Sequence, residues 1–189
     1  MSRMLNGIQP TRGEPLPFAK TIHIRSFRLE NDLVVYAAPG VSGTARAQYL
    51  NHWHEATFGG GFADAPLLVN EADAPWVKVP HTTFSGRQTV DDDFELIPIP
   101  GHTPGATAFL WERMLFTGDS LWLDGDEWIA AVLDDSDREA YIESLERLKT
   151  VEFDYLVPWG ASADGPWYAE ADPAKLDAVI ERLRRGEDR

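Results

Sequence analysis

The chain contains no cysteine among its 189 residues. Without a thiol it forms no disulfide, offers no thiolate to a metal and has no cysteine nucleophile. A metal site in this chain must therefore rest on its five histidines and on its carboxylates.

Long apolar runs and basic residues are also scarce. No run reaches the length that crosses a bilayer, and residues 1–20 carry no apolar signal core, so we expect a cytoplasmic protein without a membrane partner. Lysine and arginine total 17 against 31 aspartates and glutamates, which gives a net charge of −14. A nucleic-acid backbone requires clustered Lys and Arg, so nucleic acid is not an expected partner.

Strand-like sequence is plentiful and is followed late by helical sequence. With 43% hydrophobic residues, a chain of this length is typical of one globular domain, which we expect to span residues 1–189. The expected strands cover residues 21–29, 32–38, 47–50, 66–70, 76–79, 94–100, 107–116 and 155–157. The order of strands before helices favours a strand-rich α/β layered domain.

Two helices are predicted near the C-terminus. Over residues 136–149, Ser136 is expected to cap the helix because Glu139 follows three residues later, as in a capping box. Asp172-Pro173 opens the second helix, whose apolar residues share one face at helical spacing.

Residues 97–119, which read IPIPGHTPGATAFLWERMLFTGD, present ligand-type side chains at strand ends. His102 lies in a stiff Gly/Pro turn, and Asp119 ends the following strand-like run. Upstream, His52 and His54 are two residues apart, so at a strand end both imidazoles can converge on one point. Imidazole nitrogen suits zinc, and we predict a metal site of His52, His54 and His102, which Asp119 could complete.

Each of these elements has a plainer interpretation. An HxH pair is often incidental, a histidine in a Gly/Pro turn is often a loop residue, and an aspartate after glycine often caps a turn. Their joint occurrence in this order favours the metal site. His23 and His81 have no companion at metal-ligand spacing and are interpreted as surface or loop residues.

The order of HxH, PGHTPG and FTGD resembles the metallo-β-lactamase superfamily, including its glyoxalase II-like hydrolases, over residues 21–160. The resemblance implies an α/β fold, a four-layer αββα sandwich with a metal site at one edge of its two sheets. It also implies that His52, His54 and His102 hold the first metal and that Asp119 matches the carboxylate that bridges two metals.

The chain departs from the family pattern at the second metal. The family's HxHxDH motif reads HWHEAT here, so Ala56 and Thr57 replace an aspartate and a histidine. The closing histidine of the family is absent from residues 159–161, which read WGA. Because these departures remove ligands of the second metal, one metal ion is predicted. Too few residues separate Gly40 from His52 for the usual first helix, so a shortened fold is also predicted.

The resemblance implies metal-assisted hydrolysis of an ester, thioester or amide bond in a small-molecule substrate by metal-bound hydroxide. Three histidines leave a fourth position for water, as in catalytic zinc sites, whereas direct ligation by Asp119 would close a tetrahedral site. Iron or manganese, with more ligands, would keep room for water. We assign Asp119 as the catalytic carboxylate. A non-catalytic ligand-binding or structural relative is the alternative, and a redox-type iron protein is less favoured.

Two further expectations concern the neighbours of these residues. Glu55 is not assigned as a base, because at a strand end it would point away from His52 and His54. Trp53 and Trp159 are the candidates to line an apolar substrate cleft, although ordinary packing explains them equally well. The sequence specifies neither the substrate nor the oligomeric state.

Overall fold

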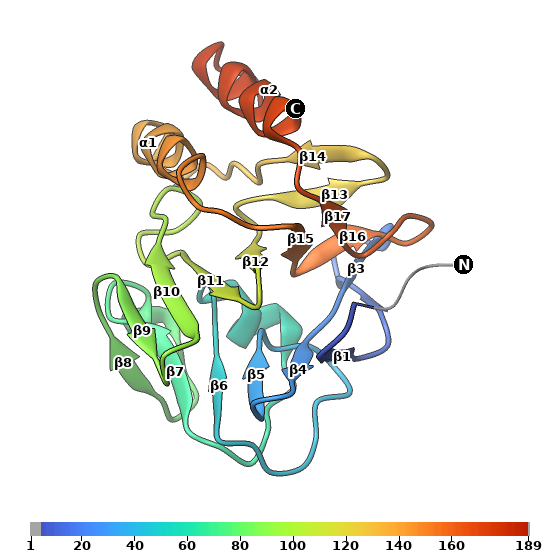
Figure 1. The fold of residues 1–189 in the computed structure, drawn as a ribbon, viewed down its shortest axis with the longest axis vertical. Coiled ribbons are helices and arrows are strands. Elements are labelled where there is room, and N and C mark those ends of the chain that lie inside the picture. The colour runs from blue at the N-terminus through green and yellow to red at the C-terminus, as the bar shows by residue number, and fades with distance from the viewer. Residues whose placement is uncertain (1–4, 189) are drawn as a thin grey trace.

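The computed structural model describes residues 5–188, and its central feature is a pair of six-stranded β-sheets packed face to face (Figure 1). The first sheet has the order β1-β4-β5-β6-β7-β8, in which β5 to β8 run parallel. The carboxyl ends of its parallel strands therefore meet at one edge. Its strands are β1 (Ile8–Pro10), β4 (Phe27–Leu29), β5 (Leu33–Val35), β6 (Ala47–Tyr49), β7 (Leu67–Asn70) and β8 (Thr82–Phe84).

The second sheet has the order β17-β15-β12-β11-β10-β9. Only β12 and β15 pair in parallel, so these two strands end at the same edge. The strands are β9 (Gln88–Val90), β10 (Phe94–Pro98), β11 (Thr107–Trp111), β12 (Met114–Gly118), β15 (Tyr155–Pro158) and β17 (Ala169–Glu170).

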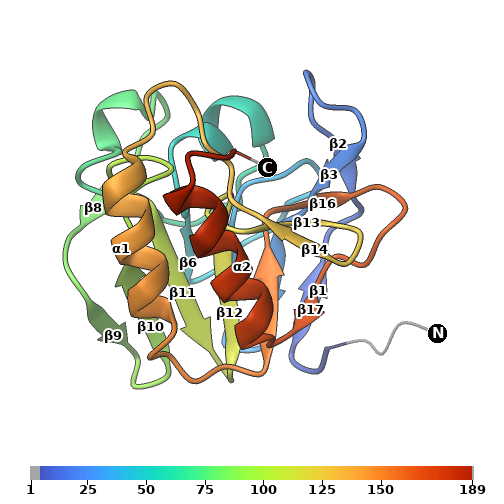
Figure 2. The same ribbon diagram turned by 90° about the horizontal axis from the view of Figure 1, so that it is seen from above.

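A smaller third sheet lies beside the sandwich, in the order β14-β13-β16-β3-β2 (Figure 2). Its strands are β2 (Glu14–Pro15), β3 (Ile22–Ile24), β13 (Trp122–Asp124), β14 (Glu127–Ile129) and β16 (Gly160–Ser162). The chain passes from the second sheet to the third almost without a break, because β16 begins two residues after β15 ends.

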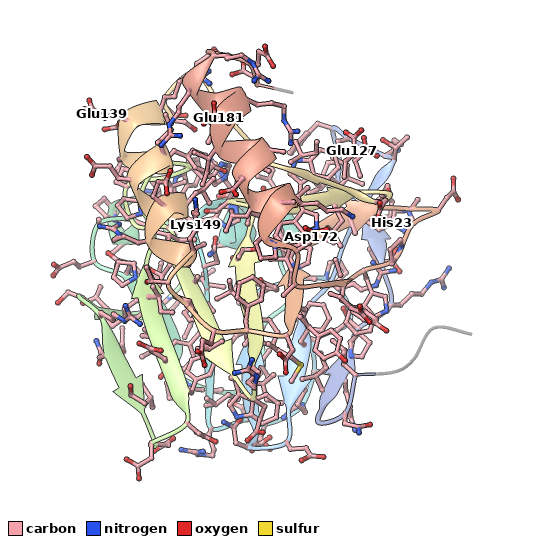
Figure 3. All side chains as sticks on the ribbon, turned by 45° about the horizontal axis from the view of Figure 1, so that its top comes forward. His23, Glu127, Glu139, Lys149, Asp172 and Glu181 are labelled. Carbon is pink, nitrogen blue, oxygen red and sulfur yellow. The ribbon has the colours of Figure 1, made fainter. Side chains whose placement is uncertain are left out.

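Helices α1 (Arg138–Leu148) and α2 (Pro173–Arg184) cover the outer side of the second sheet (Figures 1 and 2). Figure 3 shows Lys149 at the end of α1, where its Nζ lies 2.7 Å from Asp177 Oδ1 of α2. Such half-exposed ion pairs contribute at most about 1 kcal/mol. The buried leucines, valine and isoleucine of the two helices are what hold them to the sheet.

Strand β12 shows why the second sheet is buried on both faces. All five of its residues are buried, and alternate side chains enter different cores. Phe116 packs between the two sheets, with its ring centroid 5.9 Å from that of Phe27, whereas Leu115 packs under the helices. A strand with this burial is a rigid support for Asp119, which directly follows its last residue, Gly118.

The fold is shortened, as the sequence predicted, in the helical layer expected over the first sheet. Residues 41–51 contain β6 and bends but no helix, and both α-helices of residues 5–188 belong to the second sheet. Near β6 the chain forms only a π-helical turn, Glu55–Gly59. Neither α1 nor α2 has the length and hydropathy needed to span a bilayer.

Several local predictions were wrong. Residues 76–79 form no strand, because Pro75 starts a 3-10 turn over Ala74–Trp76. The run 21–29 divides into β3 and β4, which belong to different sheets. The expected cap Ser136 is replaced by Asp137, whose carboxylate accepts a hydrogen bond from Ala140 N at 3.0 Å. The hydroxyl of Ser136 instead donates to the carbonyl of His102.

Candidate metal centre

The predicted ligands lie at the edge of the sandwich where the parallel strands end. His52 and His54 follow β6 in the turn that enters the π-helical segment, His102 lies in the turn between β10 and β11, and Asp119 follows β12. Figure 2 shows the π-helical segment, the loop before α1 and the β2–β3 hairpin at this same edge. The two histidines therefore lie in the turn that follows the end of β6.

The structure brings the three histidines together. One ligand nitrogen from each lies within 4.8 Å of the others, and His54 Nδ1 is 3.1 Å from His102 Nε2. Two nitrogens held by one tetrahedral zinc ion would lie about 3.3 Å apart. His52 Nε2 is buried and has no hydrogen-bond partner among the described residues. A buried, unpaired nitrogen facing two other imidazoles fits a metal ion.

The outer nitrogens of two of these rings are held by the protein. His52 Nδ1 lies 3.0 Å from Asn51 Oδ1 and 3.2 Å from Glu55 Oε1. His102 Nδ1 lies 2.7 Å from the carbonyl oxygen of Ala131. A partner of this kind fixes the proton on the outer nitrogen and leaves the lone pair of Nε2 free for a metal. The rings are therefore oriented before any ion arrives.

The expectation that Glu55 points away from His52 was wrong. Its carboxylate is fully buried and accepts hydrogen bonds from the backbone nitrogens of Asn51 at 2.8 Å and Ala37 at 3.0 Å, besides its contact with His52. The chain leaves β6 and turns back on itself, which a strand-end geometry does not anticipate. Glu55 lies behind His52 on the side away from the open pocket, so it is a positioning residue and not a base.

Asp119 is close to two of the three histidines. Its Oδ2 lies 3.5 Å from His52 Nε2 and 3.8 Å from His102 Nε2, and its side chain is 19% exposed. The carboxylate therefore reaches the space between the rings and also faces solvent. This position suits either a metal ligand or a group that orients water beside the metal.

Asp73, which was not identified from the sequence as part of the site, joins the two histidine segments. Its buried carboxylate accepts hydrogen bonds from Trp53 N at 3.0 Å, from the Thr103 hydroxyl at 2.7 Å and from Gly105 N at 2.6 Å. The only available signal was its place just after β7, at the edge where β6 also ends. Asp73 fixes the distance between the segment of His54 and the turn of His102.

Ala56 and Thr57 lie in the π-helical segment, and neither side chain offers a carboxylate or an imidazole. Of the residues that the structure describes, only His52, His54 and His102 form a group close enough to share an ion. The number of ions stays a prediction.

Burial and charge set the protonation of the metal-free cluster. Burial lowers the pKa of His52, but the nearby carboxylates of Asp119 and Glu55 outweigh burial and raise that pKa to about 10. Burial and the charge of His52 lower the pKa of His54 to about 3 and that of His102 to about 4. Burial alone would raise the pKa of Asp119, but the contact with His52 lowers it. A proton on His52 thus occupies the place that a metal cation would take.

Metal binding is therefore expected to release one proton from His52 at neutral pH. Below the raised pKa of about 10, the ion must displace that proton, whereas His54 and His102 are already neutral above pH 5. The apparent affinity should rise about tenfold per pH unit between pH 6 and pH 9. Calorimetric titration with zinc in buffers of different ionisation enthalpy measures the proton count. An affinity independent of pH in this range would contradict the assignment.

Gly118 has a backbone conformation and a close contact that the site requires. Its φ is +59°, and an added Cβ would lie 1.9 Å from Asn51 Oδ1, the atom that faces His52. Gly118→Ala is expected to lower the free energy of unfolding by about 2–4 kcal/mol, from the positive φ together with the clash. Gly125→Ala is the matched control, because Gly125 has φ +61° and no atom within 4 Å of an added Cβ.

Gly125→Ala should lower the free energy of unfolding by only about 1 kcal/mol. Urea unfolding of both variants separates the clash from the backbone strain. Equal losses of the free energy of unfolding would show that a Cβ at position 118 does not clash with Asn51.

A pocket of about 170 Å³ opens beside the cluster, and His54, His102 and Asp119 are the polar side chains that face it. Trp159 forms part of its wall and packs edge-on against His52, with ring centroids 5.4 Å apart. Trp53 does not line the pocket; it packs against His54 and Trp76.

The other two histidines are apart from this cluster. His81 Nδ1 contacts the carbonyl oxygen of Val79 at 2.8 Å. His23 pairs with Ala161 on β3, and Figure 3 shows it on the side of the molecule away from α1.

Comparison with known proteins gives one family. A family model described as the metallo-beta-lactamase superfamily matches residues 35–160. A curated relative, the hydroxyacylglutathione hydrolase of Hydrogenovibrio crunogenus, is 28% identical over 123 residues, which is 61% of this chain and 43% of the relative. The chain thus spans less than half the length of this relative.

Solved structures show the same fold. A metallo-beta-lactamase from Pontibacter korlensis superimposes with a TM-score of 0.70 at 14% identity, over 97% of each chain. An archaeal metallo-beta-lactamase superfamily protein from Sulfolobus tokodaii gives a TM-score of 0.67 at 16% identity, over 94% of this chain and 86% of that one. These likenesses confirm the predicted sandwich in its shortened form.

Proposed function

The chain belongs to the metallo-β-lactamase superfamily, and from this membership we propose that it is a metal-dependent hydrolase that cleaves an ester, thioester or amide bond with one ion. The observation that supports the proposal is the convergence of His52 Nε2, His54 Nδ1 and His102 Nε2 beside a pocket. We propose zinc as the ion, with iron or manganese as alternatives, and a small molecule as the substrate.

A zinc ion held by these nitrogens would supply a Lewis acid and would lower the pKa of a water molecule towards about 7. The protein's own groups position the reaction. Asp119 Oδ2 lies next to two of the ligand nitrogens and is open to the pocket, so it can accept a hydrogen bond from the attacking water and take its proton. Glu55 and the carbonyl of Ala131 hold two of the rings in place.

The name of the curated relative supports a hydrolase but does not settle the bond. That relative is called a hydroxyacylglutathione hydrolase, and the present chain matches less than half of it. We propose Asp119 as the carboxylate that activates water. Its Oδ2 lies 3.5 Å from His52 Nε2, and Ala56 occupies the motif position at which the family pattern has an aspartate.

Metal analysis of protein purified without added metal tests the proposal. We expect about one equivalent of zinc, iron or manganese in the wild type and none in the double variant His52→Ala/His102→Ala, with circular dichroism to show that the fold persists. No metal above trace in the folded wild type would overturn the proposal.

Activity is tested on the metal-loaded protein. Turnover of at least one class of lactone, thioester or lactam is expected. Full metal occupancy with no turnover across these classes would favour the non-catalytic relative, and a reducible iron centre would favour the redox alternative.

A further inference from the structure

The pocket beside the histidines is apolar apart from the site itself. Its wall is built by side chains from several separate segments, and His54, His102 and Asp119 are its only polar lining residues among those described. The apolar residues on which the argument depends are Ile22, Phe18, Phe58, Trp122, Leu133 and Trp159. Beyond the point where the bond is cleaved, a wall of this kind offers a substrate mainly apolar contacts.

Charge around the pocket disfavours an anionic group inside it. No lysine or arginine of residues 5–188 lines the wall, and Lys20, two residues after Phe18, is exposed and is not one of the lining residues. Asp134 and Asp135 follow Leu133, and the whole chain carries a net charge of −14. A carboxylate placed deep in the pocket would lose its hydration without gaining a partner.

The apolar wall also disfavours a cationic group inside the pocket. Among residues 5–188, Asp119 is the one carboxylate that lines the pocket, and its Oδ2 already lies within 3.8 Å of both His52 Nε2 and His102 Nε2. An ammonium group at the far end of a substrate would therefore be desolvated against aromatic and aliphatic side chains.

The volume indicates the size of the group that the pocket can enclose. A cavity of about 150 Å³ with aliphatic and aromatic walls holds a benzene molecule. The pocket here is about 170 Å³, so a group of about six carbons fills it. At its mouth Phe18 and Phe58 pack edge to face, with ring centroids 5.1 Å apart, although they are 68% and 37% exposed. A bound chain would cover this exposed aromatic pair.

We propose that this pocket selects an uncharged, apolar acyl group of about six carbons and rejects acyl groups that carry a charge at their far end. The inference rests on the proposed hydrolase function, since the acyl carbonyl must lie at the histidines when the apolar chain lies against Trp159, Trp122 and Leu133. Selection follows from desolvation, because the neutral chain gains contacts and the charged chain loses water.

A substrate series with one neutral thiol and different acyl groups tests the inference on zinc-loaded protein. The acyl groups are acetyl, hexanoyl, dodecanoyl, 5-carboxypentanoyl and 6-aminohexanoyl. Hexanoyl is expected to have the highest kcat/KM, by at least about tenfold over both charged analogues. Equal or faster turnover of either charged analogue would overturn the proposal, as would a preference for acetyl.

A binding measurement distinguishes failure of the hydrolase assignment from failure of the pocket assignment. Hexanamide and 6-aminohexanamide are titrated into the zinc-loaded protein while the NMR signals of Trp159 and Phe58 are followed. Hexanamide is expected to bind at least about tenfold more tightly. If no thioester is cleaved but this preference holds, the function fails and the pocket assignment stands, whereas equal binding of both amides overturns the pocket assignment.

Leu133 offers a variant that should reverse the preference. It lines the pocket and is 42% exposed, so an arginine there can reach the wall from solvent. Leu133→Arg is expected to raise the ratio of 5-carboxypentanoyl to hexanoyl turnover by at least about tenfold, and Leu133→Met is expected to keep the hexanoyl preference. An unchanged ratio in Leu133→Arg would show that charge at this wall does not set selectivity.

Discussion

Replacing His52 by alanine is expected to remove the metal and with it the hydrolytic activity. His52 Nε2 is a buried nitrogen with no hydrogen-bond partner among the described residues, and it faces His54 and His102. Loss of a residue that only orients a metal ligand typically costs about 10–100-fold in affinity or activity. Loss of the ligand itself should exceed about 100-fold in both zinc affinity and kcat/KM.

The measurement is zinc content after dialysis, together with kcat/KM on the best substrate. His23→Ala is the matched control, because His23 lies on β3 in a different sheet and is not part of the cluster. It should bind zinc like the wild type. Retention of about one zinc with wild-type affinity in His52→Ala would show that the metal does not lie at the histidines.

The variant also removes the contact of Glu55 with His52, so its stability must be followed. Glu55 still accepts hydrogen bonds from Asn51 N and Ala37 N. We therefore expect a folded protein with a lower free energy of unfolding, by about 1–3 kcal/mol. His102→Ala provides a second route to the same loss of metal, since its outer nitrogen contacts only the carbonyl of Ala131.

The residues that the sequence identified are those whose role depends on local pattern. Consecutive glycines, prolines and apolar residues indicate the turn around His102 and the strand end before Asp119. In the structure His102 Nε2 lies 3.8 Å from Asp119 Oδ2. The helix over Arg138–Leu148 was also visible, although its cap is Asp137 and not Ser136.

The residues that the sequence did not identify act through tertiary contacts. Glu55 contacts His52 because the chain reverses after β6, and Asp73 joins two segments that lie far apart in the chain. Tyr36 is a third example, since its hydroxyl donates to the carbonyl of Val157 at 2.7 Å and accepts from Gly118 N at 2.9 Å. The spacing of residues in the sequence does not predict such contacts, because they depend on how the two sheets pack against each other.

These contacts explain how a shortened fold keeps a defined site. Tyr36 ties the end of β5 to the ends of β12 and β15, and Trp159 donates from its indole nitrogen to the carbonyl of Ala37 at 2.8 Å. All three bonds are buried and join segments that follow the first sheet to segments at the end of the second. His52 and His54, which follow a strand of the first sheet, are thereby held against His102 and Asp119 of the second sheet, without the helix that the chain lacks.

Replacing Asp119 by asparagine should separate catalysis from metal binding. Asparagine keeps the size of the side chain but cannot accept a proton from water, and the three histidine nitrogens remain in place. We expect about one zinc to stay bound and kcat to fall by about 10²–10⁴-fold, the contribution typical of a general base. Asp134→Asn is the matched control, because it removes one charge from the loop at the same edge without contact to a histidine.

The same variant should change the proton affinity of the metal-free site. Contact with Asp119 is the largest influence that raises the pKa of His52 to about 10 against the lowering effect of burial, so that pKa should fall in Asp119→Asn. The NMR titration of His52 measures this directly. A kcat within about twofold of the wild type, with the pKa of His52 unchanged, would show that Asp119 neither activates water nor faces the ring, and the catalytic assignment would then have to move elsewhere in the pocket.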